Sequence, residues 1–200
     1  MHKRRIVILP MLLLIMLSVL GFAYAHWTDT IYIKGSVETG TLTVGFEKTP
    51  VDPNVVDNEG TTERPQDIGK ASCYLEDEYT DPKTGKTIYR TLVLTVTNAY
   101  PSYYVGLTFV VKNAGTLPLH IKNVVFSDPT GRLVYDPATK EFTDTKTGKV
   151  ALNAGIINLV SVKLHPCDNT KAEVDIHVKQ DASQCTTYTI LVTIVAEQAQ

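Results

Sequence analysis

Runs of β-branched and apolar residues, separated by turn signals, recur along most of the chain and constrain its fold more than any other feature. The segment 87–98 reads TIYRTLVLTVTN and the segment 186–196 reads TTYTILVTIVA, with the alternation that strands show. Turns such as Asp81-Pro82-Lys83-Thr84-Gly85 lie between them. About ten short strands, with a turn every 8 to 12 residues or so, predict an all-β sandwich of the jelly-roll or immunoglobulin-like kind.

The strands are expected at 71–79, 87–98, 103–113, 117–126, 156–164, 172–179 and 186–196. Residues 48–70 are rich in proline and acidic side chains, which predicts a long surface connection. Residues 133–150 are expected to form a short polar excursion between Asp-Pro and Thr-Gly turns. No window after the first 25 residues has a helical period of 3.6.

The first 25 residues have the composition of a secretory signal peptide. Three basic residues precede an uncharged apolar run from Ile6 to Phe22, which ends at Ala23-Tyr24-Ala25, a small-x-small cleavage pattern. Signal peptidase is therefore an expected partner during export, and the mature chain is expected to be secreted. Because the apolar run is longer than a usual signal sequence, an uncleaved membrane anchor remains the alternative.

Composition limits the classes of function. A chain of 200 residues with 44% apolar and 20% charged residues fits one globular domain, here 38–200. The formal net charge is −2, and removal of Lys3, Arg4 and Arg5 makes the mature chain more acidic. There is no basic stripe, so nucleic acid is not an expected partner.

The segment 26–37, HWTDTIYIKGSV, follows the cleavage site and alternates like a strand. Its apolar side chains share one side of an extended ribbon: Trp27, Ile31, Ile33 and Val37. After this segment the apolar residues move from odd-numbered to even-numbered positions. This change requires a break in the strand, and Gly35 and Gly40 are expected to supply the hinge. Such an arm can add to the sheet of a second molecule, fold back as the first strand of its own domain, or swap once into a dimer.

Motifs of enzymes are missing from the sequence. It contains no His-Glu-x-x-His, Gly-x-Ser-x-Gly, phosphate-binding glycine loop or Cys-x-x-Cys, so no catalytic residue, cofactor or small-molecule substrate is predicted. The histidines His120, His165 and His177 are expected to be packed or solvent-edge residues. Cleavage after Ala25 would make His26 the N-terminus, where an amino group and an imidazole can bind copper; this is a minor alternative.

Two further groups of side chains have a structural and a functional interpretation. The acidic group Glu76, Asp77, Glu78 and Asp81 lacks the pattern of a calcium loop, so we expect a solvated hairpin end and no metal site. The tyrosines at 100, 103 and 104 could stack on sugars, but we expect them to cap an edge of the sandwich with their hydroxyls in water.

Three cysteines, Cys73, Cys167 and Cys185, permit one disulfide in an exported chain. A strand at 172–179 would separate Cys167 from Cys185 by roughly 25 Å, too far for a bond between them. A disulfide between Cys73 and one of the other two is therefore expected, with the choice left open.

Three stretches resemble the TasA and camelysin family of secreted fibre proteins, and in particular its archaeal bundling pilins. They are the AYAHWTDT junction with the following GSV and TGTL, the stretches NAYPSY and NAGTLPL, and the tail 192–198. The resemblance implies a jelly-roll subunit that polymerises outside the cell by donor-strand complementation, with itself as partner, into filaments that bundle in a biofilm matrix. Some relatives are classed as metallopeptidases, but a zinc motif is missing here. A membrane-anchored surface binding module or adhesin is the alternative.

Overall fold

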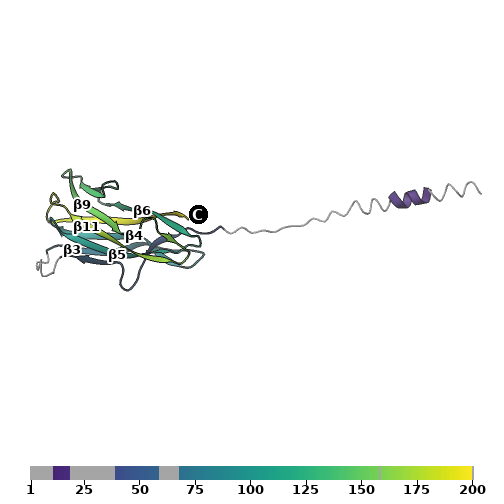
Figure 1. Ribbon diagram of the computed structural model, residues 1–200, viewed down its shortest axis with the longest axis horizontal. Coiled ribbons are helices and arrows are strands. Elements are labelled where there is room, and N and C mark those ends of the chain that lie inside the picture. The colour runs from purple at the N-terminus through teal and green to yellow at the C-terminus, as the bar shows by residue number, and fades with distance from the viewer. Residues whose placement is uncertain (1–10, 19–38, 59–67, 158, 200) are drawn as a thin grey trace, which may run out of the picture. The chain divides into compact units, whose positions relative to one another are not determined.

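The computed structural model describes residues 11–18, 39–58, 68–157 and 159–199. The chain divides into two compact units, Met1–Glu38 and Thr39–Gln200. In the first unit, residues 11–18 form a helix. The described residues of the second unit form strands joined by turns and loops (Figure 1). The all-β class predicted from the sequence is therefore confirmed.

The described residues of the second unit form twelve strands. They are β1 (Val44–Glu47), β2 (Asn54–Asp57), β3 (Lys70–Thr80), β4 (Thr87–Ala99), β5 (Tyr104–Asn113), β6 (Leu119–Ser127), β7 (Leu133–Asp136), β8 (Glu141–Asp144), β9 (Lys149–Ile157), β10 (Lys163–Leu164), β11 (Asn169–Val178) and β12 (Thr186–Gln198).

The strands form one antiparallel sheet in the order β10-β6-β12-β4-β1-β5-β11-β9-β8-β7, with β2 beside β5 and β3 beside β4. The sheet curls, so that strands far apart in this order face each other. Phe126 in β6 lies 5.0 Å from Tyr135 in β7 and 5.9 Å from Phe142 in β8, measured between ring centroids. The core is thus enclosed by a sheet that bends back on itself.

The core consists of the inward side chains of the long strands. Leu92, Leu94 and Val96 alternate along β4 and are fully buried, and β5, β11 and β12 contribute in the same way. Phe46 of β1 packs edge-on against Phe109 of β5 at 5.2 Å. The period-two alternation read from the sequence is therefore the alternation that fills the core.

The predicted strands agree with the structure except in three places. The expected surface connection 48–70 contains β2. The expected polar excursion 133–150 is a hairpin of two short strands, β7 and β8, followed by the start of β9. The expected strand 156–164 is wrong, because β9 ends at Ile157 and β10 contains Lys163 and Leu164 alone. The jelly-roll topology remains a prediction.

Candidate strand-acceptor groove

Strand β1 is paired along one side only for most of its length. On that side it pairs with β5 from Val44↔Asn113 to Glu47↔Val110. The pairing continues before the strand, because the backbone N–H of Ala114 donates to the carbonyl of Thr43 at 2.8 Å. On the opposite side, β1 meets β4 at Phe46↔Tyr89. Within the described residues, no strand pairs with this second side before Phe46.

Strand β12 stops pairing with β4 close to the place where β1 meets β4. It pairs with β4 from Thr186 to Thr193, where Thr193 lies opposite Thr91. Beyond Thr193 it continues along β6 to Gln198, and between Val195 and Ala196 the register skips Lys122, which is the extra residue of a bulge in β6. In the described part of the chain, the side of β12 that faces away from β6 has no paired strand after Thr193.

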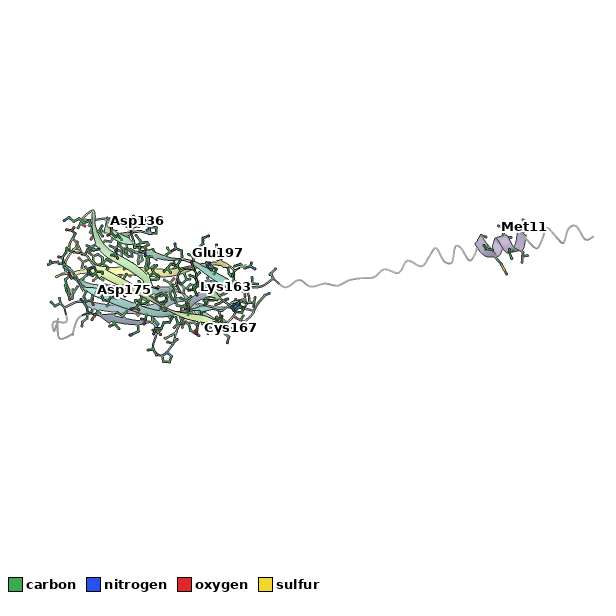
Figure 2. All side chains as sticks on the ribbon, viewed as in Figure 1. Met11, Asp136, Lys163, Cys167, Asp175 and Glu197 are labelled. Carbon is green, nitrogen blue, oxygen red and sulfur yellow. The ribbon has the colours of Figure 1, made fainter. Side chains whose placement is uncertain are left out.

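A groove of about 440 Å³ lies where β1 and β12 diverge from β4. Its lining comes from the start of β1, the end of β12 and the β3–β4 hairpin: Leu42, Thr43, Val44, Tyr79, Arg90, Thr91, Thr193, Ile194, Val195 and Ala196. Glu197 directly follows Ala196, which lines the groove. In Figure 2, Glu197 lies with Lys163 and Cys167 toward one end of the sheet, whereas Asp136 lies toward the opposite end. We call this feature the β1–β12 groove.

The β1–β12 groove leaves part of the hydrophobic core incompletely covered. Val44, Ile194 and Ala196 pack against the core cluster but are only partly buried. Leu42 and Val195 are exposed, at 43% and 40%. The groove therefore combines two unpaired strand edges with an apolar floor, which is the arrangement that an added strand completes.

Asp81 fixes β1 against the β3–β4 hairpin beside the groove. Its carboxylate is fully buried and accepts hydrogen bonds from the Thr43 hydroxyl at 2.6 Å and from the backbone N–H groups of Lys83 at 2.9 Å and Thr84 at 3.0 Å. Burial by itself raises the pKa of Asp81, but the hydrogen bonds from Thr43, Thr84, Thr41 and Lys83 outweigh it and hold the pKa well below its usual value.

This position of Asp81 corrects the expectation of a solvated acidic group. Glu76, Asp77 and Glu78 are exposed, as expected, but Asp81 points inward. The side chain heads a turn in which its oxygens replace main-chain acceptors, a role that aspartate often has. The sequence signal, an Asp-Pro turn, predicted the turn and not the contact with Thr43.

Glycines allow the close approach of backbones around β1. A Cβ on Gly115 would overlap the carbonyl oxygen of Thr41 and lie 2.8 Å from the backbone nitrogen of Thr43. Gly40, one of the two predicted hinges, lies against the side chain of Leu117. This close packing against Leu117 accounts for a glycine at position 40. A hinge at this position stays a prediction. The other predicted hinge, Gly35, lies outside the described residues.

The predicted donor strand also lies outside the described residues. This holds for Trp27, Ile31, Ile33 and Val37, and for His26 of the copper alternative. The interpretation of these residues therefore remains the one drawn from the sequence. The β1–β12 groove was not predicted, because its edges belong to strands that are 150 residues apart in sequence and meet only through β4.

The expected disulfide is not formed, since all three cysteines are free. Cys73 lies in the middle of β3, opposite Leu94 of β4. Cys167 precedes β11 and Cys185 precedes β12, so the ten residues of β11 separate them, as expected. Cys73 is therefore central on its strand, whereas the other two cysteines lie at the ends of strands.

Tyr103 differs from its predicted position at an edge. It is fully buried, and its hydroxyl donates to Asp57 at 2.7 Å instead of facing water. Tyr104 is exposed, and its hydroxyl donates to Asp175. His165 and His177 are exposed and His120 is partly buried, as expected of residues at the solvent edge. The tyrosines therefore hold the β4–β5 connection to neighbouring strands.

A second groove, of about 460 Å³, lies between the loop 48–53 and β3. Its lining includes Thr49, Asp52, Cys73, Leu75 and Tyr89. A loop forms one wall, so an entering strand would meet a continuous strand edge on one side only. We therefore take the β1–β12 groove as the candidate site.

Comparison with known proteins identifies no relative: no family model, curated protein or solved structure matches the chain. In the ranges that the structure describes, no helix has the length and apolar character needed to cross a bilayer. The same ranges contain no group of three or more histidine, cysteine or acidic side chains placed to hold a metal ion.

Proposed function

We propose that this chain is a secreted structural subunit that polymerises by donor-strand complementation into extracellular filaments. In this proposal, residues 26–37 of one molecule enter the β1–β12 groove of the next. The observation that carries it is the pair of unpaired strand edges, on β1 before Phe46 and on β12 after Thr193, above partly buried core residues. The resemblance to the TasA and camelysin family supports the same conclusion, including bundling in a biofilm matrix.

The energetics favour such an exchange. Main-chain hydrogen bonds to both edges of the groove would hold the donor, and alternate side chains would cover Val44 and Ile194. Full burial of Ile31, Ile33 and Val37 contributes about 5 to 9 kcal/mol before the cost of ordering the arm. Because donor and acceptor are different surfaces, the contact is head-to-tail and continues into a filament.

A complementation experiment tests the proposal. Ile31→Asp places a charge on the donor, and Leu42→Asp places one in the acceptor; each variant is expected to be secreted, folded and unable to form filaments. Mixed together, the two variants retain one intact donor and one intact acceptor. We expect a 1:1 heterodimer in analytical ultracentrifugation and no longer polymer.

The control is Val134→Asp, which changes a 58% exposed valine on β7 away from the groove. This variant should form filaments of normal length in negative-stain micrographs. Filaments from Leu42→Asp would contradict the choice of groove, and filaments from Ile31→Asp would contradict the donor strand. If the wild-type mature chain stays monomeric at high concentration, residues 26–37 do not add to the sheet of a second molecule, and the proposal fails.

A further inference from the structure

Lys112, Asn169 and Glu47 come together from three adjacent strands. Lys112 of β5 lies directly opposite Asn169 at the start of β11. On the other side of β5, Lys112 lies opposite Gly45 of β1, two residues before Glu47. Since residues two apart on a strand share a face, the three side chains lie on the same face of the sheet.

The Glu47 carboxylate holds the other two groups at once. Its Oε1 forms an ion pair with the Lys112 amine, and its Oε2 accepts a hydrogen bond of 2.9 Å from the Asn169 amide nitrogen. The side chains of Lys112 and Glu47 are 16% and 21% exposed, so both are largely shielded from water. One carboxylate therefore contacts both an amine and a carboxamide, with the amine and the carboxylate largely shielded from water and Asn169 exposed.

These three groups are the components of an amide exchange reaction: a nucleophile, an electrophilic carbonyl and a proton carrier. The four other ion pairs among the described residues lack this combination, because none of their carboxylates also binds an asparagine amide. We propose that Lys112 and Asn169 condense spontaneously into an intramolecular isopeptide bond, with Glu47 as the proton carrier.

The reaction needs no external reagent. Glu47 takes a proton from the Lys112 ammonium, and the freed amine attacks Cγ of Asn169 to form the new C–N bond. Glu47 returns that proton to the Asn169 nitrogen and accepts a second proton from the Lys112 nitrogen. The old C–N bond then breaks and ammonia leaves, which takes up the proton that remains on Glu47. The balance is one ammonium and one carboxamide converted into one secondary amide and one ammonium ion.

The electrostatics oppose the first proton transfer. Burial raises the pKa of Glu47, but hydrogen bonds from Lys112 and Asn169 and the charge of Lys112 outweigh it, so the pKa lies below its usual value. The resting pair is therefore ionic. Partial exclusion of water reduces the cost of the neutral pair, and the fixed geometry supplies a high effective concentration. We expect condensation to follow folding slowly.

The bond would join β5 to β11 beside β1. These two strands pair over nine consecutive positions, and the link would fix their pairing at one end. The inference does not rest on the proposed function, because a cross-link of this kind forms in a monomer as readily as in a filament. Failure of one proposal therefore leaves the other open to its own test.

Peptide mapping of the purified full-length or secreted chain tests the inference. Trypsin does not cleave after a lysine whose amine is acylated. We expect the segment Thr91–Lys122 to appear joined to the segment Leu164–Lys171, with the loss of one ammonia molecule. Separate peptides ending at Lys112 and at Lys171 with Asn169 unchanged, or Asn169 hydrolysed to aspartate without a link, would overturn the proposal.

Variants separate the chemistry from the packing. Lys112→Arg keeps the ion pair but carries a guanidinium that stays protonated, and it should give no joined peptide. Glu47→Gln keeps the size of the side chain and removes the proton carrier, so the link should also be lost. Lys171→Arg, in β11 two residues from Asn169, is the matched control and should keep the link. A joined peptide in Glu47→Gln would exclude the role given to Glu47.

Discussion

The hydroxyl of Thr43 donates a hydrogen bond of 2.6 Å to Oδ2 of Asp81, and this buried contact ties the segment that leads into β1 to the β3–β4 hairpin. The two residues are 38 positions apart in sequence. Their contact sets the position of one wall of the β1–β12 groove, because Thr43 itself lines that groove. The Asp81 carboxylate therefore contributes to the stability of this end of the sheet.

Replacement of Asp81 by alanine should destabilise the protein by about 2 to 4 kcal/mol, because it removes a buried charged acceptor. The Thr43 hydroxyl then loses its hydrogen bond to the Asp81 carboxylate. The measurement is the free energy of unfolding in urea. Asp136→Ala is the matched control: Asp136 heads a similar Asp-Pro turn but is exposed, so its loss should cost no more than about 1 kcal/mol. Equal costs for the two variants would show that the contact with Thr43 contributes nothing.

The protein should lose stability in acid. Burial raises the pKa of Asp144, but hydrogen bonds from Arg132 at 2.7 and 3.0 Å outweigh it and lower the pKa, as for Asp81. A lowered folded-state pKa contributes stability that is complete above the unfolded value of about 3.9 and is lost as the pH falls toward the folded value. Unfolding free energies measured from about pH 6 down to about pH 2 should therefore decrease.

The same pH series on Asp81→Asn and Asp144→Asn attributes the effect to these residues. Each variant should show a smaller decrease than the wild type, because the substituted amide does not titrate. Asp136→Asn should keep the full decrease. A wild-type stability that is constant over this range, or an equal decrease in all four proteins, would contradict the assignment.

The three thiols should differ in reactivity. Burial raises the pKa of Cys73, which is partly buried in β3, whereas Cys167 and Cys185 are exposed. Because the thiolate is the reactive form, an alkylating reagent should modify Cys167 and Cys185 quickly in the native protein and Cys73 slowly. Mass spectrometry of the alkylated peptides reads this order. Two thiols that resist the reagent until a reductant is added would instead indicate a disulfide.

Gly115→Ala should destabilise the protein by about 1 to 3 kcal/mol, because its methyl group would overlap the backbone of Thr41 and Thr43. Gly155→Ala is the control, since its Cβ would meet the Cβ of Asp175 at an ordinary 3.8 Å. We expect its unfolding free energy to change by less than about 1 kcal/mol. A Gly115→Ala protein as stable as the wild type would show that the loop 114–117 can move away from β1.

Much of the sheet could be predicted because its signal is local. Alternation of apolar and polar residues in β4 and β12 reports which side chains face the core, and Asp-Pro and Thr-Gly turns report where strands end. The short strands β2, β7, β8 and β10 were missed or misplaced. Strands of two to four residues carry too few alternating positions to differ from a loop, and their pairing partners decide whether they form.

The sequence by itself determined the all-β class and the positions of the long strands, because both depend on residues within a few positions of one another. The tertiary structure decided that Asp81 is buried, that the three cysteines are unpaired, and that Glu47, Lys112 and Asn169 meet. It also decided that β1 and β12 diverge from β4 and leave a groove. Each of these depends on which strands become neighbours when the sheet curls, and a period of two along one strand carries no information about the neighbour of that strand.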